Sequence, residues 1–162
     1  MNNDLETLKD ILLHEDELHA QLVQLAGQMQ QALKERRAER IQSITQSYDE
    51  VTLHIERLEE ARLALCDKLN VRSGHTNLTA IIKVLPEKQQ QEFQAIRSRL
   101  KEKISRLVKL NTANNIMLQE SLAAMNQTMA DLAASNVHSP GYQHSGRKSA
   151  EPQSVSMFNH VA

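Results

Sequence analysis

The sequence is poor in the residues that build turns and aromatic cores. Its 162 residues include four Gly, three Pro, two Phe, two Tyr and no Trp. β-Sandwiches and β-barrels need frequent turn-forming residues and strands rich in aromatic side chains, so these fold classes are excluded. The abundant residues are Leu, Ala, Gln, Glu, Lys and Arg, which are good helix formers. The composition therefore predicts an all-α protein.

The sequence also lacks an excess of one charge, a second cysteine and a long apolar run. Its 19 basic and 20 acidic residues are interspersed, which argues against nucleic-acid binding. The single Cys66 cannot form an internal disulfide and fits a reducing compartment. Without a run of 18 apolar residues or a signal-peptide core, no membrane span or export signal is expected. We therefore expect a cytoplasmic protein that is not embedded in a membrane.

A long helical pattern occupies the second half of the chain. No Gly or Pro occurs between Glu87 and Asn136, so we expect one helix from Glu87 to about Ala133, roughly 70 Å long. Its seam residues recur at a mean spacing of about 3.5, which is typical of coiled-coil-like packing. These residues are Phe93, Ile96, Leu100, Ile104, Leu107, Asn111, Asn114, Leu118, Leu122, Met125, Met129 and Leu132.

Two shorter helical patterns precede it. Leucines recur at helical spacing over residues 4–34, and a second apolar seam covers 38–70. Between them the charged run Lys34 to Arg40 offers only Ala38 to a core, so two antiparallel helices joined near Arg36 are predicted. No Gly, Pro, Asn or Asp marks this break, and one continuous helix is the alternative. Gly27, inside the first pattern, is expected to mark a close contact between helices.

The remaining segments are a short connector and a tail. A short helix is predicted from Leu78 to Leu85, ended by Pro86. The chain is thus predicted to form an elongated antiparallel helical bundle over residues 1–134. Residues 135–162 are rich in Ser, Gly and Pro, and we expect them to form a disordered tail. Tyr142 stands out in this tail, either within an inert segment or as part of a recognition motif.

Motifs of catalysis and metal binding are missing from the sequence. It contains no Gly-rich phosphate loop, no nucleophile elbow and no zinc signature. The closest helical pairing of a histidine with an acid is Asp16 with His19, and a di-iron bundle would need a second Glu-x-x-His. Cys66 has no identifiable partner that would make it a nucleophile. We expect neither enzymatic activity nor a metal or cofactor.

The unequal helix lengths predict an uncovered apolar stripe. Two helices of roughly 45 Å beside one of roughly 70 Å leave an overhang of about 25 Å, around Met117 to Ala133. Such a stripe usually binds a partner, and methionine makes it adaptable. Two other arrangements fit the periodicity, a bundle that folds back over the stripe and a homodimer. Asn111 and Asn114 either fix the register of the helices or contact a partner. The candidate partner-binding residues are Asn111, Asn114, Met117, Leu118, Leu122, Met125, Met129 and Leu132.

The segment Asn111-Thr-Ala-Asn114-Asn115-Ile-Met117-Leu118 resembles the N-x-x-N-G-x-L-L motif near the C-terminal helix of the FlgN family of flagellar export chaperones. Tyr142-Gln-His-Ser-Gly146 is similar to the family's Y-G-x-x-G. The amphipathic first helix and the Leu58-Glu-Glu-Ala-Arg62 run agree as well, so the resemblance covers residues 5–146. This sequence has Asn115 and Gln143 where the family often has glycine. The second difference puts the turn of the tail in doubt.

The resemblance implies a cytosolic chaperone of the flagellar type III export system. Its partners would be the hook-associated proteins of the hook–filament junction, whose C-terminal amphipathic helices it would bind before export. Tyr142 and Gly146 of the tail would contact the membrane export-gate protein. No cofactor is implied, and self-association would be weak at most. A homo-oligomeric coiled-coil scaffold is the alternative function that the helical periodicity alone leaves open.

Overall fold

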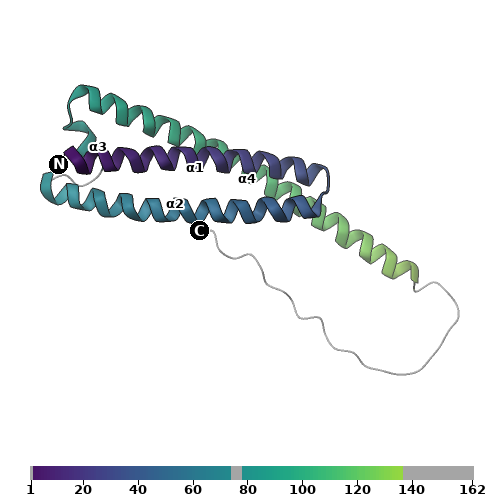
Figure 1. Cartoon of the computed structure of the whole chain (residues 1–162). Helices are drawn as coiled ribbons and strands as arrows, with labels where there is room; N and C mark the ends of the chain where they lie inside the picture. The colour runs from purple at the N-terminus through teal and green to yellow at the C-terminus, as the bar shows by residue number, and fades with distance from the viewer. Residues whose placement is uncertain (1, 74–77, 137–162) are drawn as a thin grey trace, which may run out of the picture. The chain divides into compact units, whose positions relative to one another are not determined.

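The computed structural model describes residues 2–73 and 78–136. In this part the chain forms four α-helices and no strand (Figure 1). They are α1 (Asn2–Lys34), α2 (Ala38–Ser73), α3 (Leu78–Lys83) and α4 (Glu87–Asn136). The predicted all-α class, with two mid-length helices, a short connecting helix and one long helix, is confirmed. Over the same residues, no helix is both long enough and apolar enough to cross a membrane.

The chain divides into two compact units, Met1–Ala124 and Met125–Ala162. The boundary falls inside α4, so the first unit contains α1, α2, α3 and the larger part of α4. The described part of the second unit, residues 125–136, is the C-terminal end of that helix. The tail was expected to start at residue 135, and residues 135 and 136 are the last two residues of α4. The rest of the expected tail lies outside the described residues.

The turn between α1 and α2 has an arginine where a glycine is usual, and for this reason no typical turn residue marks it in the sequence. Arg36 has a φ of 53°, a left-handed conformation that glycine usually takes at a helix C-terminus. The Arg37 N–H donates to the Ala32 carbonyl at 3.0 Å and the Arg36 N–H to the Leu33 carbonyl at 3.1 Å. This pair of bonds forms a Schellman motif with arginine in the glycine position. The predicted break near Arg36 is confirmed, and a single continuous helix is wrong.

In the first unit, apolar side chains from all four helices meet in one cluster. A second, smaller cluster follows it along α1, α2 and α4 and is bordered by the half-buried Tyr48 and Val51. The buried members of the first cluster are Leu5, Leu8, Leu12, Cys66, Leu69, Ile81, Ile82, Phe93, Ile96 and Leu100. The buried members of the second are Leu22, Ala26 and Leu107.

Contacts between helices give their directions within this unit. α1 and α4 run in the same direction, because their contacts advance along both helices. α2 runs opposite to both, because its late residue Cys66 packs in the cluster of Phe93 whereas its early residue Tyr48 contacts Asn111. Figure 1 shows α1 and α2 side by side over most of their length. The α1–α4 contacts are Lys9 with Glu92, Asp16 with Lys103 and Ala26 with Asn114.

Two details of the expected packing are wrong. Ile104, placed in the seam by its spacing, is 42 % exposed, and Lys103 takes the inward position beside Asp16. A straight helix has 3.6 residues per turn, so a seam with a 3.5-residue repeat drifts around it. This drift allows Lys103 instead of Ile104 to face inward, where it neutralises Asp16. Gly27 does not mark a close helix contact, because a Cβ built there would meet nothing within 4 Å.

Candidate functional site

The two seam asparagines join α4 to its neighbours. The Asn114 amide donates to the main-chain oxygen of Ala26 on α1 at 2.8 Å, and Asn114 is buried. The Asn111 amide donates to the Tyr48 hydroxyl on α2 at 2.7 Å. These contacts fit the register-fixing role, because each bond forms only when α4 stands at one height against its neighbour. A direct partner contact by either asparagine stays a prediction.

The cover of the α4 seam ends just after Asn114. Leu118 and Leu122 continue the line of Asn111 and Asn114 at steps of three and four residues, so they project from the same helical face. Yet Leu118 is 41 % exposed and Leu122 is 52 % exposed. One face of α4 is therefore packed at Asn114 and uncovered one turn later, within the first unit.

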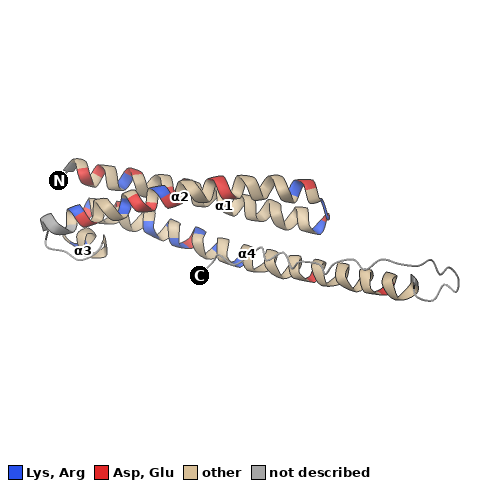
Figure 2. Ribbon diagram, turned by 90° about the horizontal axis from the view of Figure 1, so that it is seen from below, with Lys and Arg blue, Asp and Glu red and all other residues tan. Residues whose placement is uncertain are grey.

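The described residues of the second unit continue this exposure. Met125, Met129 and Leu132 are 62 %, 66 % and 59 % exposed, and their spacing of four and three places them on one helical face. We call Leu118, Leu122, Met125, Met129 and Leu132 together the apolar stripe. Residues 110–136 contain no Lys or Arg, and Figure 2 shows this end of α4 almost without charge. In each unit the stripe residues are exposed, uncharged apolar side chains.

Met117 differs from the other candidate residues. It is half-buried, whereas Leu118, the next residue, is 41 % exposed. Met117 lies one turn after the buried Asn114 and keeps part of the cover that Leu118 lacks. Among the candidate residues, Leu118 and Leu122 are thus exposed in the first unit, and Met125, Met129 and Leu132 are exposed in the second. Asn111 and Asn114 lie in the packed seam of the first unit.

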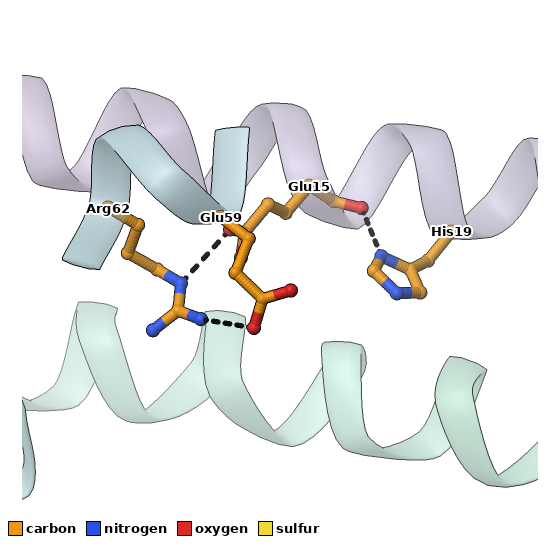
Figure 3. A network of polar contacts seen from close by, with 4 residues as sticks. All are labelled: Glu15, His19, Glu59 and Arg62. Carbon is orange, nitrogen blue, oxygen red and sulfur yellow. Dashed lines mark hydrogen bonds and ion pairs between the residues drawn. The ribbon is translucent and has the colours of Figure 1, made fainter. Parts of the chain in front are cut away.

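A buried polar layer lies between the two apolar clusters, and the sequence reasoning missed it. Glu15 is buried, and its carboxylate accepts from Arg62 Nε at 3.0 Å (Figure 3). Arg62 also donates to Glu59 at 3.2 Å, and His19 Nδ1 lies 2.7 Å from the main-chain oxygen of Glu15. The signal in the sequence was a gap of one turn and a half between Leu12 and Leu18 that acids fill.

Asp16 forms the other half of this layer. Its Oδ1 lies 2.7 Å from Lys103 Nζ and its Oδ2 lies 3.3 Å from Arg99 Nε, both on α4. Lys103 also donates to the main-chain oxygen of Asp16 at 3.0 Å. Buried carboxylates need such partners because a charge without one is costly away from water. Glu15 thus ties α1 to α2, and Asp16 ties α1 to α4.

The titratable groups show structural roles. Burial raises the pKa of the Cys66 thiol, an effect that the nearby Arg62 partly offsets. The hydrogen bond and charge of Lys9 lower the pKa of Glu92. Across residues 2–73 and 78–136 no three His, Cys, Asp or Glu side chains gather into a group that could hold a metal ion. Tyr142 and Gly146, the expected export-gate residues, lie outside the described residues.

Comparison with known proteins places the chain in a family. The family model described as FlgN protein matches residues 1–150, which is most of the sequence. No curated protein and no solved structure matches the chain in the same comparisons. The matched range includes the asparagines of the seam, the whole apolar stripe and the polar layer. The chain belongs to the FlgN family, a family of flagellar export chaperones and not of enzymes.

Proposed function

We propose that this protein is a cytosolic chaperone for hook-associated proteins of the hook–filament junction, and that the apolar stripe binds their C-terminal amphipathic helices. The observation that carries the proposal is the loss of cover after Asn114 on an otherwise continuous seam. Covering a large apolar side chain yields about 1.5–3 kcal/mol, so the five residues offer a gross gain on the order of 10 kcal/mol. A surface of this kind favours a partner over water.

The shape and chemistry of the stripe favour a helix as its ligand. Its residues recur at steps of three and four, which is the spacing at which one amphipathic helix packs along another. The flexible side chains of Met125 and Met129 adapt to different partner surfaces, which suits a chaperone with more than one client. A client helix held here would have its own apolar face hidden and could not assemble until it is released.

The tail has a separate role in this proposal. Tyr142 and Gly146 would contact the membrane export-gate protein and deliver the loaded chaperone. Tyr142→Ala should leave client binding unchanged and reduce recovery of the chaperone by the cytosolic domain of the export gate in a pull-down. Equal recovery of variant and wild type would remove Tyr142 from this role.

The stripe can be tested by two changes that place charge on it. Leu122→Asp with Met129→Asp should weaken binding of a client's C-terminal helix by about a hundredfold or more, because two apolar contacts are lost. The measurement is isothermal titration calorimetry with the helix as a synthetic peptide. Helix content by circular dichroism should stay unchanged, since both side chains are exposed.

A matched control separates the stripe from general surface changes. Leu53→Asp with Ile116→Asp also places two charges at exposed apolar positions, on α2 and on another face of α4. This variant should bind the client peptide as the wild type does. Unchanged affinity in the stripe variant would refute the proposed site. Tight self-association lost in that same variant, measured by analytical ultracentrifugation, would instead favour the coiled-coil scaffold.

A further inference from the structure

The first unit carries a second apolar surface, an open trough that the proposed client site does not use. Its volume is about 900 Å³. Leu12, Cys66 and Leu100 are buried at its base, while Leu63 on α2 and Ile104 on α4 are 51 % and 42 % exposed. The residues that line it are Leu12, Glu15, Arg62, Leu63, Cys66, Asp67, Leu78, Thr79, Gln94, Arg97, Ser98, Leu100, Lys101 and Ile104.

The size of the trough matches a short helix. On α4 it extends from Gln94 to Ile104, which is about 15 Å at 1.5 Å per residue. Three turns of a partner helix have the same length and present apolar side chains at positions i, i+3 or i+4, and i+7. Leu63 and Ile104 face such a helix from opposite walls, and each would be covered by it.

The charges around the trough are asymmetric. Arg97 and Lys101 are exposed on the α4 wall, and neither has an ion pair within residues 2–73 and 78–136. Arg62, by contrast, is already bound to Glu15 and Glu59. The α2 wall carries Asp67, which likewise has no ion pair in the part of the chain that the structure describes. The α4 wall therefore complements acidic groups and the α2 wall complements a basic one.

We propose that this trough binds an amphipathic helix of a partner protein, about three turns long, whose apolar face enters between Leu63 and Ile104 and whose acidic edge lies along Arg97 and Lys101. The charge asymmetry fixes the orientation of the helix, because the reverse placement sets its acids against Asp67. The site is separate from the apolar stripe, so it exists whether or not the stripe binds clients.

The test uses two synthetic peptides of about 18 residues, long enough to form a helix on binding. Both carry the same leucine stripe, and one has glutamates along one edge where the other has lysines. Fluorescence anisotropy with the full-length protein should show binding of the glutamate peptide about tenfold tighter than that of the lysine peptide. The difference should shrink as salt is added, because the charges at the rim are exposed.

Charge reversal on the protein tests the assigned edge. Arg97→Glu with Lys101→Glu should invert the preference between the two peptides. Arg106→Glu with Lys109→Glu changes the net charge equally, on exposed residues of α4 that do not line the trough, and should keep the original preference. Leu122→Asp with Met129→Asp should also keep it. These peptide preferences are expected whether or not the stripe binds clients, so failure of the client site would not affect this test.

Cys66 reports occupancy directly. It is the only cysteine of the chain and lies at the base of the trough, 7 % exposed. Its reaction with Ellman's reagent should slow in proportion to the bound fraction of the glutamate peptide. The Arg97→Glu, Lys101→Glu variant should show this protection with the lysine peptide instead.

Four outcomes would overturn the proposal. Equal affinity for the two peptides would remove the charge recognition, and binding without protection of Cys66 would place the ligand elsewhere. Concentration-dependent protection of Cys66 without peptide would show that a second copy of the chain fills the trough. Faster modification of Cys66 in a full-length Met157→Asp, Phe158→Asp variant, without peptide, would show that the chain's own C-terminal segment fills it.

Discussion

Two stretches of α4 have the same apolar period and different surroundings. From Phe93 to Asn114 the seam packs against α1 and α2, whereas from Leu118 to Leu132 the same spacing leads to exposed side chains. Their charge differs as well, with seven Lys or Arg between residues 87 and 109 and none in residues 110–136. Period alone therefore predicts which face of a helix is apolar and says nothing of what covers it.

The charges of the first stretch follow from its packing. Lys103 and Arg99 neutralise Asp16, and Lys9 on α1 meets Glu92, so cations on this stretch hold helices together. The second stretch has no acid of another helix to neutralise in the described residues. Because this stretch has no Lys or Arg, a helix packed along it would bury no cation of α4.

Truncation of a leucine in each stretch gives the largest expected contrast. Leu100→Ala should lower the free energy of unfolding by about 3 kcal/mol, because it removes a buried side chain and leaves a cavity. Leu122→Ala should lower it by less than about 0.5 kcal/mol, because the side chain is already exposed. Urea denaturation at equal m-values measures both. Equal losses would mean that the second stretch is covered after all.

The polar layer gives the next largest effect. Asp16→Asn should lower the free energy of unfolding by about 2 kcal/mol, because Lys103 and Arg99 lose the anion that they share. Asp10→Asn, an exposed position on the same helix, should change it by less than about 0.5 kcal/mol. The same denaturation series serves both variants. A loss at Asp16 no greater than at Asp10 would show that the layer does not hold α1 to α4.

The smallest effects concern the backbone of α1 and its turn. Gly27→Ala should stabilise the protein by about 1 kcal/mol, because alanine favours the helix and its Cβ meets open space. Arg36→Gly should raise the free energy of unfolding by about 1 kcal/mol, because only glycine takes a φ of 53° without strain. Thermal denaturation should show a higher midpoint for each. Arg37→Gly is the control for the turn, and a gain there equal to that at Arg36 would contradict the explanation.

Much of the fold could be predicted from local signals. The absence of Gly and Pro over residues 87–136 predicted α4, and the lapse of the apolar seam between Lys34 and Arg40 predicted the turn. The position of Ile104 could not be predicted, because it depends on Asp16, which is 88 residues away in the sequence and beside Lys103 in the fold. The open surroundings of Gly27 likewise depend on how closely another helix approaches.

The candidate site likewise has features that the sequence predicted and features that depend on tertiary contacts. Its residues were predicted from spacing and composition, and the resemblance named the family that the comparison confirmed. The separation of Asn111 and Asn114 from the exposed residues depends on tertiary contacts, because by their spacing all of them lie on one face of α4. The trough between α2 and α4 had no signal in the sequence, since its lining residues come from four helices.

The sequence by itself determined the helices, their apolar faces and the family. Helix propensity and period are properties of neighbouring residues, so they can be read along the chain. Only the tertiary structure decided where α4 loses its cover, which acids are buried and where a trough stays open. Those features depend on how far each helix extends beside the others and on which charges meet across them, and both are set by residues distant in the sequence.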